Sequence, residues 1–273
     1  MTQPSAYYVW GKVNDGDASL RLTQQHFLCT QLFGWLIHPR ITALWHVEDS
    51  YERKRIADVA CGNAIWAMEV ANSTIGTNAD VIGLDIKPDL FPQQAWVPPN
   101  VKLGLWNIFE PPPKEYEETF DVVNIRLVFG AVSNGDPRPV LHNLMKLLKR
   151  GGSLQWLEYD FDNPVVAKES AWNQMRDMFR KSRSHHSNQW VVNLGDICRE
   201  EGLEQVETIR ALPQKSMLKF WKDLWYCSVK ELVQGVRHPE VNALWEELNK
   251  ETAALGYVPI QTPITLVIAQ KKR

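Results

Sequence analysis

The sequence lacks the features that would mark a nucleic-acid-binding or membrane-spanning protein. Its 273 residues include 30 Lys and Arg against 32 Asp and Glu, a formal charge of −2, and no block of basic residues. A nucleic-acid partner therefore has no electrostatic support. No apolar run approaches the ~18 residues of a membrane helix. Residues 1–17 contain no basic region followed by an apolar run, so we expect neither a membrane span nor a signal peptide.

Cysteine is scarce, whereas tryptophan is abundant. The four cysteines are Cys29, Cys61, Cys198 and Cys227, and no two of them have CxxC spacing. This argues against a metal site and favours a reducing, cytoplasmic setting. The 12 tryptophans are expected mainly to pack helices on helices. The alternative is that some of them line a pocket for a flat, apolar ligand.

Glycine-rich phosphate motifs are missing as well. The segment 55–70 (RIADVACGNAIWAMEV) predicts a buried strand, a turn of small residues and a helix. A GxGxxG pattern would need glycines where Ala60, Gly62 and Ile65 stand, and no GxxxxGK[ST] occurs, so a dinucleotide site is poorly supported. The next strand, 79–84, ends in Asp85, 23 residues after Gly62. An acid at about this distance is what a ribose-binding nucleoside site uses.

The order of elements predicts an α/β fold. Strands are expected at 55–60, 80–85, 101–105, 120–125 and 153–158, and four prolines between 87 and 100 argue against a regular helix there. A helix at 137–150 should end at Gly151-Gly152. Alternating strands and helices imply a parallel sheet with right-handed crossovers. Other helices are predicted at 18–35, 41–47, 164–184, 194–202, 217–235 and 240–255, with strands at 204–212 and from 264.

Several segments, taken in order, resemble the motifs of class I S-adenosylmethionine-dependent methyltransferases. DVACGNAIW (58–66) resembles motif I, usually D/E-x-G-x-G-x-G, with Asp58 as the acid, Gly62 kept, and Ala60 and Ala64 replacing the outer glycines. FDVVNIR (120–126) resembles the fourth-strand motif, and LLKRGGSLQW (147–156) resembles the turn into strand five. YVWG (8–11), LRLTQQHF (20–27) and the helical pair before the last strand are similar to fungal secondary-metabolite methyltransferases.

This resemblance implies a Rossmann-like, seven-stranded, mostly parallel sheet in one compact domain. Residues 1–50 would form a helical extension or lid, 51–160 the cofactor-binding core, and 161–273 the rest of the sheet with helical insertions. The implied cofactor is S-adenosyl-L-methionine. Its expected contacts are Asp58, Ala60, Cys61, Gly62, Asp85, Ile86, Trp106, Asn107, Ile108 and Arg126. For Asp58, the alternative is that it binds only backbone N–H groups of the turn. For Asp85, the alternative is an exposed strand-end acid.

The implied activity is methyl transfer to O, N or S of a small, mainly apolar metabolite, without metal, nucleic acid or membrane. Glu158 and His26 are the first candidates for a general base, ahead of Asp160, His185 and His186. Glu158 and Asp160 could instead be capping or solvated acids, and the two loop histidines could be solvated. The residues expected to contact the substrate are Tyr8, Trp10, His185 and Trp225.

Two other functions fit the same sequence. The fold could bind the cofactor and catalyse a cyclisation or pericyclic step, since no base is evident. Alternatively, the chain could be a non-catalytic regulatory subunit, a homodimer whose two long C-terminal helices, with Trp221, Trp225 and Trp245, form the dimer face.

Overall fold

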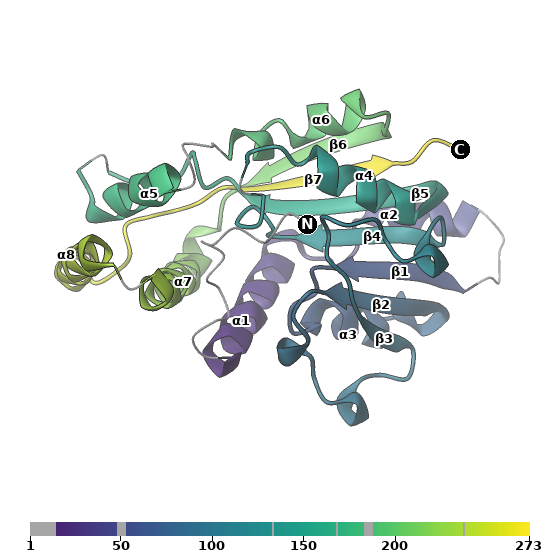
Figure 1. Cartoon of the computed structure of the whole chain (residues 1–273), viewed down its shortest axis with the longest axis horizontal. Coiled ribbons are helices and arrows are strands. Elements are labelled where there is room, and N and C mark those ends of the chain that lie inside the picture. The colour runs from purple at the N-terminus through teal and green to yellow at the C-terminus, as the bar shows by residue number, and fades with distance from the viewer. Residues whose placement is uncertain (1–14, 48–52, 133, 168, 183–187, 237) are drawn as a thin grey trace.

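The computed structural model describes residues 15–47, 53–132, 134–167, 169–182, 188–236 and 238–273. A seven-stranded sheet with the order β3-β2-β1-β4-β5-β7-β6 forms its centre (Figure 1). The strands are β1 (Lys54–Val59), β2 (Ala79–Asp85), β3 (Val101–Leu105), β4 (Phe120–Arg126), β5 (Leu148–Tyr159), β6 (Glu204–Ala211) and β7 (Ile264–Gln270). Strands β1 to β5 are parallel, and β7 is antiparallel to both β5 and β6. The predicted mostly parallel α/β fold is confirmed.

Helices pack along the sheet and beyond one end of it. They are α1 (Asp15–Phe33), α2 (Pro39–Val47), α3 (Ile65–Asn72), α4 (Arg138–Leu147), α5 (Ala171–Ser182), α6 (Leu194–Glu200), α7 (Leu218–Val236) and α8 (Pro239–Leu255). Between β2 and β3 the structure has only short 3₁₀ turns, as the prolines predicted. Among the described residues, no helix is both long and apolar enough to cross a membrane.

The apolar runs of the sequence became the sheet because both faces of these strands are covered. In β1 the last four residues are fully buried, and β4 and β7 are buried along nearly their whole length. Such continuous apolar runs are typical of strands sandwiched between layers. Strand β1 lies between β2 and β4, so the chain order reverses at β1. Ligands of open α/β sheets bind in the crevice that such a reversal opens at the carboxyl ends of the strands.

The predicted end of the helix before β5 was wrong. The helix stops at Leu147, not at Arg150, because Leu148 is buried and pairs with Phe120 of β4. Gly151 has a φ of 77°, so the expected left-handed glycine exists, but it lies inside β5 at an irregularity of the ladder. Gly152 allows close packing there, since a Cβ would come within 2.9 Å of the Phe120 carbonyl oxygen.

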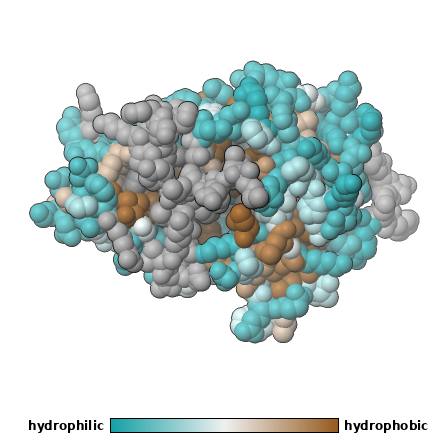
Figure 2. Space-filling model, viewed as in Figure 1, coloured by the Kyte–Doolittle hydropathy of each residue, from teal (hydrophilic) through white to brown (hydrophobic). Residues whose placement is uncertain are grey.

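Helix α1 connects the sheet to the inserted helices. It packs against α3 on one side and α7 on the other (Figure 1). Helices α7 and α8 pack on each other, and α5 packs on α8, forming a group beside the sheet. Segment 164–184 is less helical than predicted, since α5 begins only at Ala171 and Val165 instead bridges to Gln261. On the face in Figure 2 the surface is mainly hydrophilic, with smaller hydrophobic areas.

Candidate cofactor and acceptor site

The turn between β1 and α3 has an alternating backbone conformation. Ala60, Gly62 and Ala64 have φ angles of 54°, 56° and 58°, the left-handed region that favours glycine. These are the three positions at which motif I usually has glycine, so the two alanines keep the turn at a cost of about 1 kcal/mol each. At Gly62 itself a side chain would crowd Leu22 of α1, because a Cβ would lie 3.0 Å from its Cδ1 atom.

Asp85, at the end of β2, is tied to this turn. Its Oδ2 accepts a hydrogen bond from the Gly62 N–H at 2.8 Å, and its Oδ1 accepts one from the Lys87 N–H at 2.9 Å. Burial raises the pKa of Asp85, and these backbone N–H groups oppose the rise. Asp85 is therefore a fixed, half-buried acceptor and not an exposed strand-end acid.

A cavity of about 340 Å³ lies over the turn and the strand ends, within the size range of small-molecule sites. Its wall comes from the carboxyl ends of β1 to β5 and from α1 and α7. Nine of the residues predicted to bind the cofactor line it. These are Ala60, Cys61, Gly62, Asp85, Ile86, Trp106, Asn107, Ile108 and Arg126.

Asp58 is the predicted cofactor residue that does not line the cavity. It is 2% exposed, and its Oδ1 accepts a hydrogen bond from the Asn124 Nδ2 at 2.9 Å. Its Oδ2 has no hydrogen-bond partner in the described part of the chain. Burial raises the pKa of Asp58 to about 6. Its position below the turn supports a structural role there.

The residues after β3 form one side of the cavity. Trp106 Nε1 donates to the Glu110 and Pro111 carbonyl oxygens at 3.2 and 3.3 Å, so the indole is fixed. Asn107 Oδ1 accepts from the Phe109 N–H at 3.1 Å and keeps a second lone pair. Together with Ile86 and Ile108, these side chains form the largely apolar surroundings that an adenine ring requires.

His26 lines the cavity, but both of its ring nitrogens have partners. Arg126 Nη1 lies 3.2 Å from Nδ1, and Nε2 contacts Glu69 Oε2. Arginine can only donate, so Nδ1 is the acceptor and Nε2 carries the proton. Burial and the Arg126 charge lower the pKa of His26 to about 4. A base role for His26 would therefore require that Arg126 moves away from Nδ1.

Glu158, the other predicted base, is fully buried and does not line the cavity. Its carboxylate accepts from the Val128 and Phe129 N–H groups, both at 3.0 Å, and from Trp156 Nε1 at 2.7 Å. Burial raises the pKa of Glu158 to about 8 against the effect of these donors. Asp160 is also buried and pairs with Arg210. Neither acid is a solvated one.

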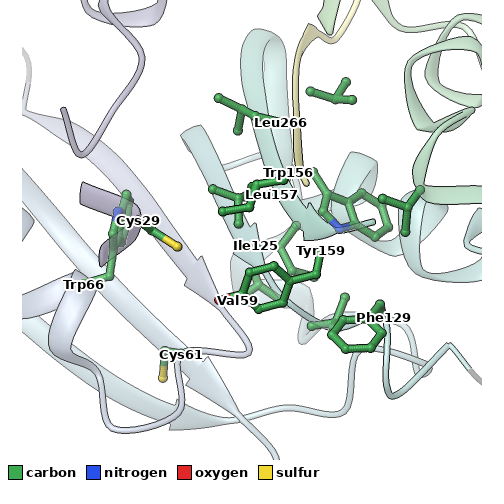
Figure 3. Close-up of a cluster of buried hydrophobic side chains, with 14 of the residues drawn as sticks. Cys29, Val59, Cys61, Trp66, Ile125, Phe129, Trp156, Leu157, Tyr159 and Leu266 are labelled. Carbon is green, nitrogen blue, oxygen red and sulfur yellow. The ribbon is translucent and has the colours of Figure 1, made fainter. Parts of the chain in front are cut away.

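Tyr159 is the residue of β5 that faces the cavity. Successive residues of a strand point to opposite faces, so Glu158 and Asp160 point away from the side that Tyr159 occupies. The predicted base Glu158 thus lies on the other face of this strand, which could not be foreseen because the LEYD segment has no apolar–polar alternation. Figure 3 shows Tyr159 and Phe129 close together, with Ile125 and Val59 beside them.

The predicted substrate residues are only partly described. Trp225 of α7 lines the cavity, together with Ser228 of the same helix. Tyr8, Trp10, His185 and the candidate base His186 lie outside the described residues. Sequence reasoning missed the lining residues Arg21, Gln25, Phe129 and Tyr159. The only signal for the first two was their place in the LRLTQQHF segment.

The lining residues fit S-adenosylmethionine. The Asp85 carboxylate, pinned by Gly62, has lone pairs left for two ribose hydroxyls. The small residues of the turn would let the backbone approach the ligand, and Arg126 would supply a cation for the methionine carboxylate. In the described part of the chain, no group of three or more His, Cys, Asp or Glu residues could hold a metal ion.

Comparison with known proteins gives the same assignment. Residues 56–152 match the family model described as a methyltransferase domain. Methyltransferase grgD of a Penicillium species is 33% identical over 66% of this chain and 61% of its own length. N-methyltransferase verN of Clonostachys rogersoniana is 30% identical over 56% of this chain and 50% of its own length. The chain thus spans between half and two thirds of these curated relatives.

Solved structures share the fold. A phosphoethanolamine N-methyltransferase of Haemonchus contortus, in complex with S-adenosyl-L-methionine, superimposes with a TM-score of 0.53 at 12% identity, covering 100% of this chain and 61% of that one. The motif turn, the Asp85–Gly62 pair, the strand order and the sequence relatives agree on one assignment. The chain contains a methyltransferase domain over residues 56–152 and resembles the class I S-adenosylmethionine-dependent methyltransferases, whose cofactor fits the residues that line its cavity.

Proposed function

We propose that this protein transfers a methyl group from S-adenosylmethionine to a small, mainly apolar metabolite of the kind made in fungal secondary metabolism. One observation carries the proposal: a single cavity joins the Gly62–Asp85 turn to an apolar wall of Phe129, Tyr159 and Trp225. A nucleoside-binding end and an aromatic end in one cavity suit a cofactor and an acceptor placed side by side.

The residues of the chain have positioning roles in this proposal. When bound, S-adenosylmethionine supplies a methyl group already activated by its sulfonium. Asp85 holds the ribose, Arg126 holds the carboxylate, and the aromatic wall orients the acceptor and excludes water. Proximity and alignment are the main contributions that such a site makes to the rate.

We further propose nitrogen as the acceptor atom. Among the described residues that line the cavity, Asp85 is the only carboxylate, and the turn already engages it. The imidazole of His26 is also occupied. An amine or ring nitrogen attacks through its own lone pair, whereas a weakly acidic hydroxyl needs a base. The Clonostachys relative is itself named an N-methyltransferase, which supports the same choice.

The domain organisation predicted from the sequence stands as part of this proposal. Helix α1 lines the cavity and lies within residues 1–50, which supports a lid there. Strand β7, at the end of the chain, lies between β5 and β6, which supports one domain that includes residues 161–273. A cytoplasmic location and a homodimer stay predictions.

The proposal is tested by incubating the protein with methyl-labelled cofactor and a pool of candidate metabolites. Mass spectrometry should find S-adenosylhomocysteine and one labelled product in equal amounts. Turnover of a metabolite without S-adenosylhomocysteine would instead favour the cyclisation alternative. Cofactor binding without any turnover would favour the regulatory one.

A matched pair of variants tests the cofactor site. Asp85→Asn removes the ribose acceptor and should weaken S-adenosylhomocysteine binding about tenfold or more in calorimetry. Asp80→Asn is the control, because Asp80 lies on the same strand but pairs with Arg53 far from the cavity. Wild-type affinity in Asp85→Asn, or no binding of either form of the cofactor by the wild type at millimolar concentration, would refute the proposed site.

A further inference from the structure

A chain of four polar side chains runs from α7 through α1 to β5 along the cavity wall. Glu231 Oε2 accepts from Arg21 Nε at 2.7 Å, Arg21 Nη1 donates to Gln25 Oε1 at 3.5 Å, and Gln25 Nε2 lies 3.2 Å from the Tyr159 hydroxyl. Arg21, Gln25 and Tyr159 all line the cavity. Because these residues belong to three separate elements, only the tertiary structure brings this chain of hydrogen bonds together.

The direction of these hydrogen bonds determines what Tyr159 can offer. Arginine has no acceptor, so Gln25 must turn its oxygen toward Arg21 and its NH₂ group toward Tyr159. The Tyr159 oxygen therefore accepts from Gln25, and its own O–H proton must point elsewhere. The bond with Gln25 is the hydrogen bond that the Tyr159 hydroxyl makes in the described part of the chain.

The Tyr159 hydroxyl stays a donor at neutral pH. Tyr159 is 4% exposed, and burial raises its pKa well above the ordinary value. An unused donor in so enclosed a site is costly unless a ligand accepts its proton. A hydrogen-bond acceptor on the bound molecule would give the Tyr159 hydroxyl a partner for its proton.

Aromatic rings pack around the ring of Tyr159 and define the shape of a partner that binds beside it. The Tyr159 ring lies 5.1 Å from Trp225 and 6.2 Å from Phe129, measured between centroids. Phe161 lies behind them, 5.9 Å from Phe129 and 5.6 Å from Trp225. Such walls suit a flat, apolar body.

The charges near this end exclude an anionic partner. The Arg21 guanidinium is already paired with Glu231, and their side chains are only 11% and 8% exposed. The His26 imidazole is neutral at pH 7, because its pKa is lowered to about 4. Arg126 is the remaining cation close enough to act on Tyr159, and in the proposed function it holds the methionine carboxylate. With the cofactor bound, a carboxylate on the acceptor would thus meet no unpaired cation at the Tyr159 end, whereas a neutral carbonyl needs only a donor.

We propose that Tyr159 determines acceptor specificity, and that the acceptor is a neutral, flat molecule whose carbonyl oxygen accepts a hydrogen bond from the Tyr159 hydroxyl. This rests on the proposed function for the position of the acceptor end. It goes further by assigning the chemical class of the acceptor and the residue that recognises it.

Two probes that differ only in the carbonyl test the proposal. 4-Aminoacetophenone and 4-ethylaniline are both flat, neutral aromatic amines, and only the first has a carbonyl oxygen. Calorimetry on the full chain, with and without saturating S-adenosylhomocysteine, should show the ketone binding about tenfold more tightly, the effect of one buried hydrogen bond.

Variants then assign this preference to one hydroxyl. Tyr159→Phe keeps the aromatic cluster and should reduce the ratio of the two affinities to about one. Tyr226→Phe is the matched control and should keep the wild-type ratio, because Tyr226 bonds Asn249 away from the cavity. A general loss of structure would weaken both probes alike, so the ratio is compared only where the variant still binds both probes.

Three results would overturn the proposal: equal affinity for the two probes in the wild type, an unchanged ratio in Tyr159→Phe, or no binding of either probe at millimolar concentration. Failure of the proposed function is a separate result, since it would appear as absent S-adenosylhomocysteine binding in the same titrations. The probe ratio measured without S-adenosylhomocysteine would still decide the role of Tyr159.

Discussion

His26 shows how a single buried residue gains its chemistry from its neighbours. The sequence made it a candidate base because histidine titrates near neutral pH. In the folded chain it is 1% exposed and held between Arg126 and Glu69. It accepts a hydrogen bond from Arg126, and both residues line the cavity.

This arrangement predicts a pH-dependent loss of stability. The ordinary His26 pKa of 6.5 is lowered to about 4 in the folded chain. As the pH falls from 6.5 to about 4, the unfolded chain binds a proton that the folded chain does not. The free energy of unfolding should therefore fall by up to roughly 3 kcal/mol across this window. The His26→Gln variant should lack this part of the fall, because it has no imidazole to protonate.

Urea unfolding of both proteins above pH 6.5 and near pH 4 measures the difference. The exposed His142→Gln variant serves as control for the other titrating groups. Parallel pH profiles of His26→Gln and the wild type would show that His26 is not held neutral by the fold.

Ala60 and Ala64 show which residue-scale features the sequence does predict. Their place in the motif predicted the turn, and the structure gives both the left-handed backbone of the usual glycines. By contrast, the sequence could not predict which of Glu158 and Tyr159 faces the cavity. Which side of β5 faces the crevice depends on the neighbouring strands and not on the LEYD segment.

The turn after β4 is the element that depends on Glu158. Two successive N–H groups, from Val128 and Phe129, donate to its two carboxylate oxygens. Leu127, at the start of the turn, has a φ of 61°. Residues 127–131 line the cavity, so Glu158 shapes the acceptor end without reaching it.

Above pH 8, where Glu158 is ionised, Glu158→Gln should destabilise the protein by about 2–3 kcal/mol, because its NH₂ group would face an N–H donor in a buried site. Chemical denaturation measures the loss, and the exposed Glu115→Gln variant should stay within about 0.5 kcal/mol of the wild type. A fully stable Glu158→Gln protein would show that the native acid already holds a proton.

Helix α1 is joined to α7 by the Arg21–Glu231 pair, which is almost buried. Glu231→Gln should cost about 3 kcal/mol, because it leaves the Arg21 charge without its carboxylate. The double variant Arg21→Met with Glu231→Leu should recover most of that loss.

A matched control lies on the same helix. Lys219 and Asp223 form an exposed pair, and Lys219→Ala should change stability by less than about 0.5 kcal/mol. Equal effects of Glu231→Gln and Lys219→Ala in thermal unfolding would contradict a structural link between α1 and α7.

For the whole molecule, the cavity joins parts of the chain that lie far apart in sequence. It is lined by α1, by the ends of five strands, and by α7, which follows the core by some distance in sequence. A ligand that fills this cavity should therefore stabilise the entire fold and not only the strands of the core.

S-adenosylhomocysteine at about 100 times its dissociation constant should add ~2.7 kcal/mol of stability, a rise in Tm of about 5 °C or more. Differential scanning calorimetry measures the shift, and Asp85→Asn should lose most of it at the same ligand concentration. A shift of equal size in both proteins would place the ligand away from Asp85.

The sequence by itself determined the strands, the mostly parallel sheet and the cofactor end of the cavity. These depend on local apolar runs, on a turn of small residues, and on an acid at a fixed distance from Gly62. The tertiary structure alone decided the acceptor end. Arg21, Gln25, Tyr159 and Trp225 belong to α1, β5 and α7. Their meeting depends on helix packing and strand facing, which no local pattern encodes.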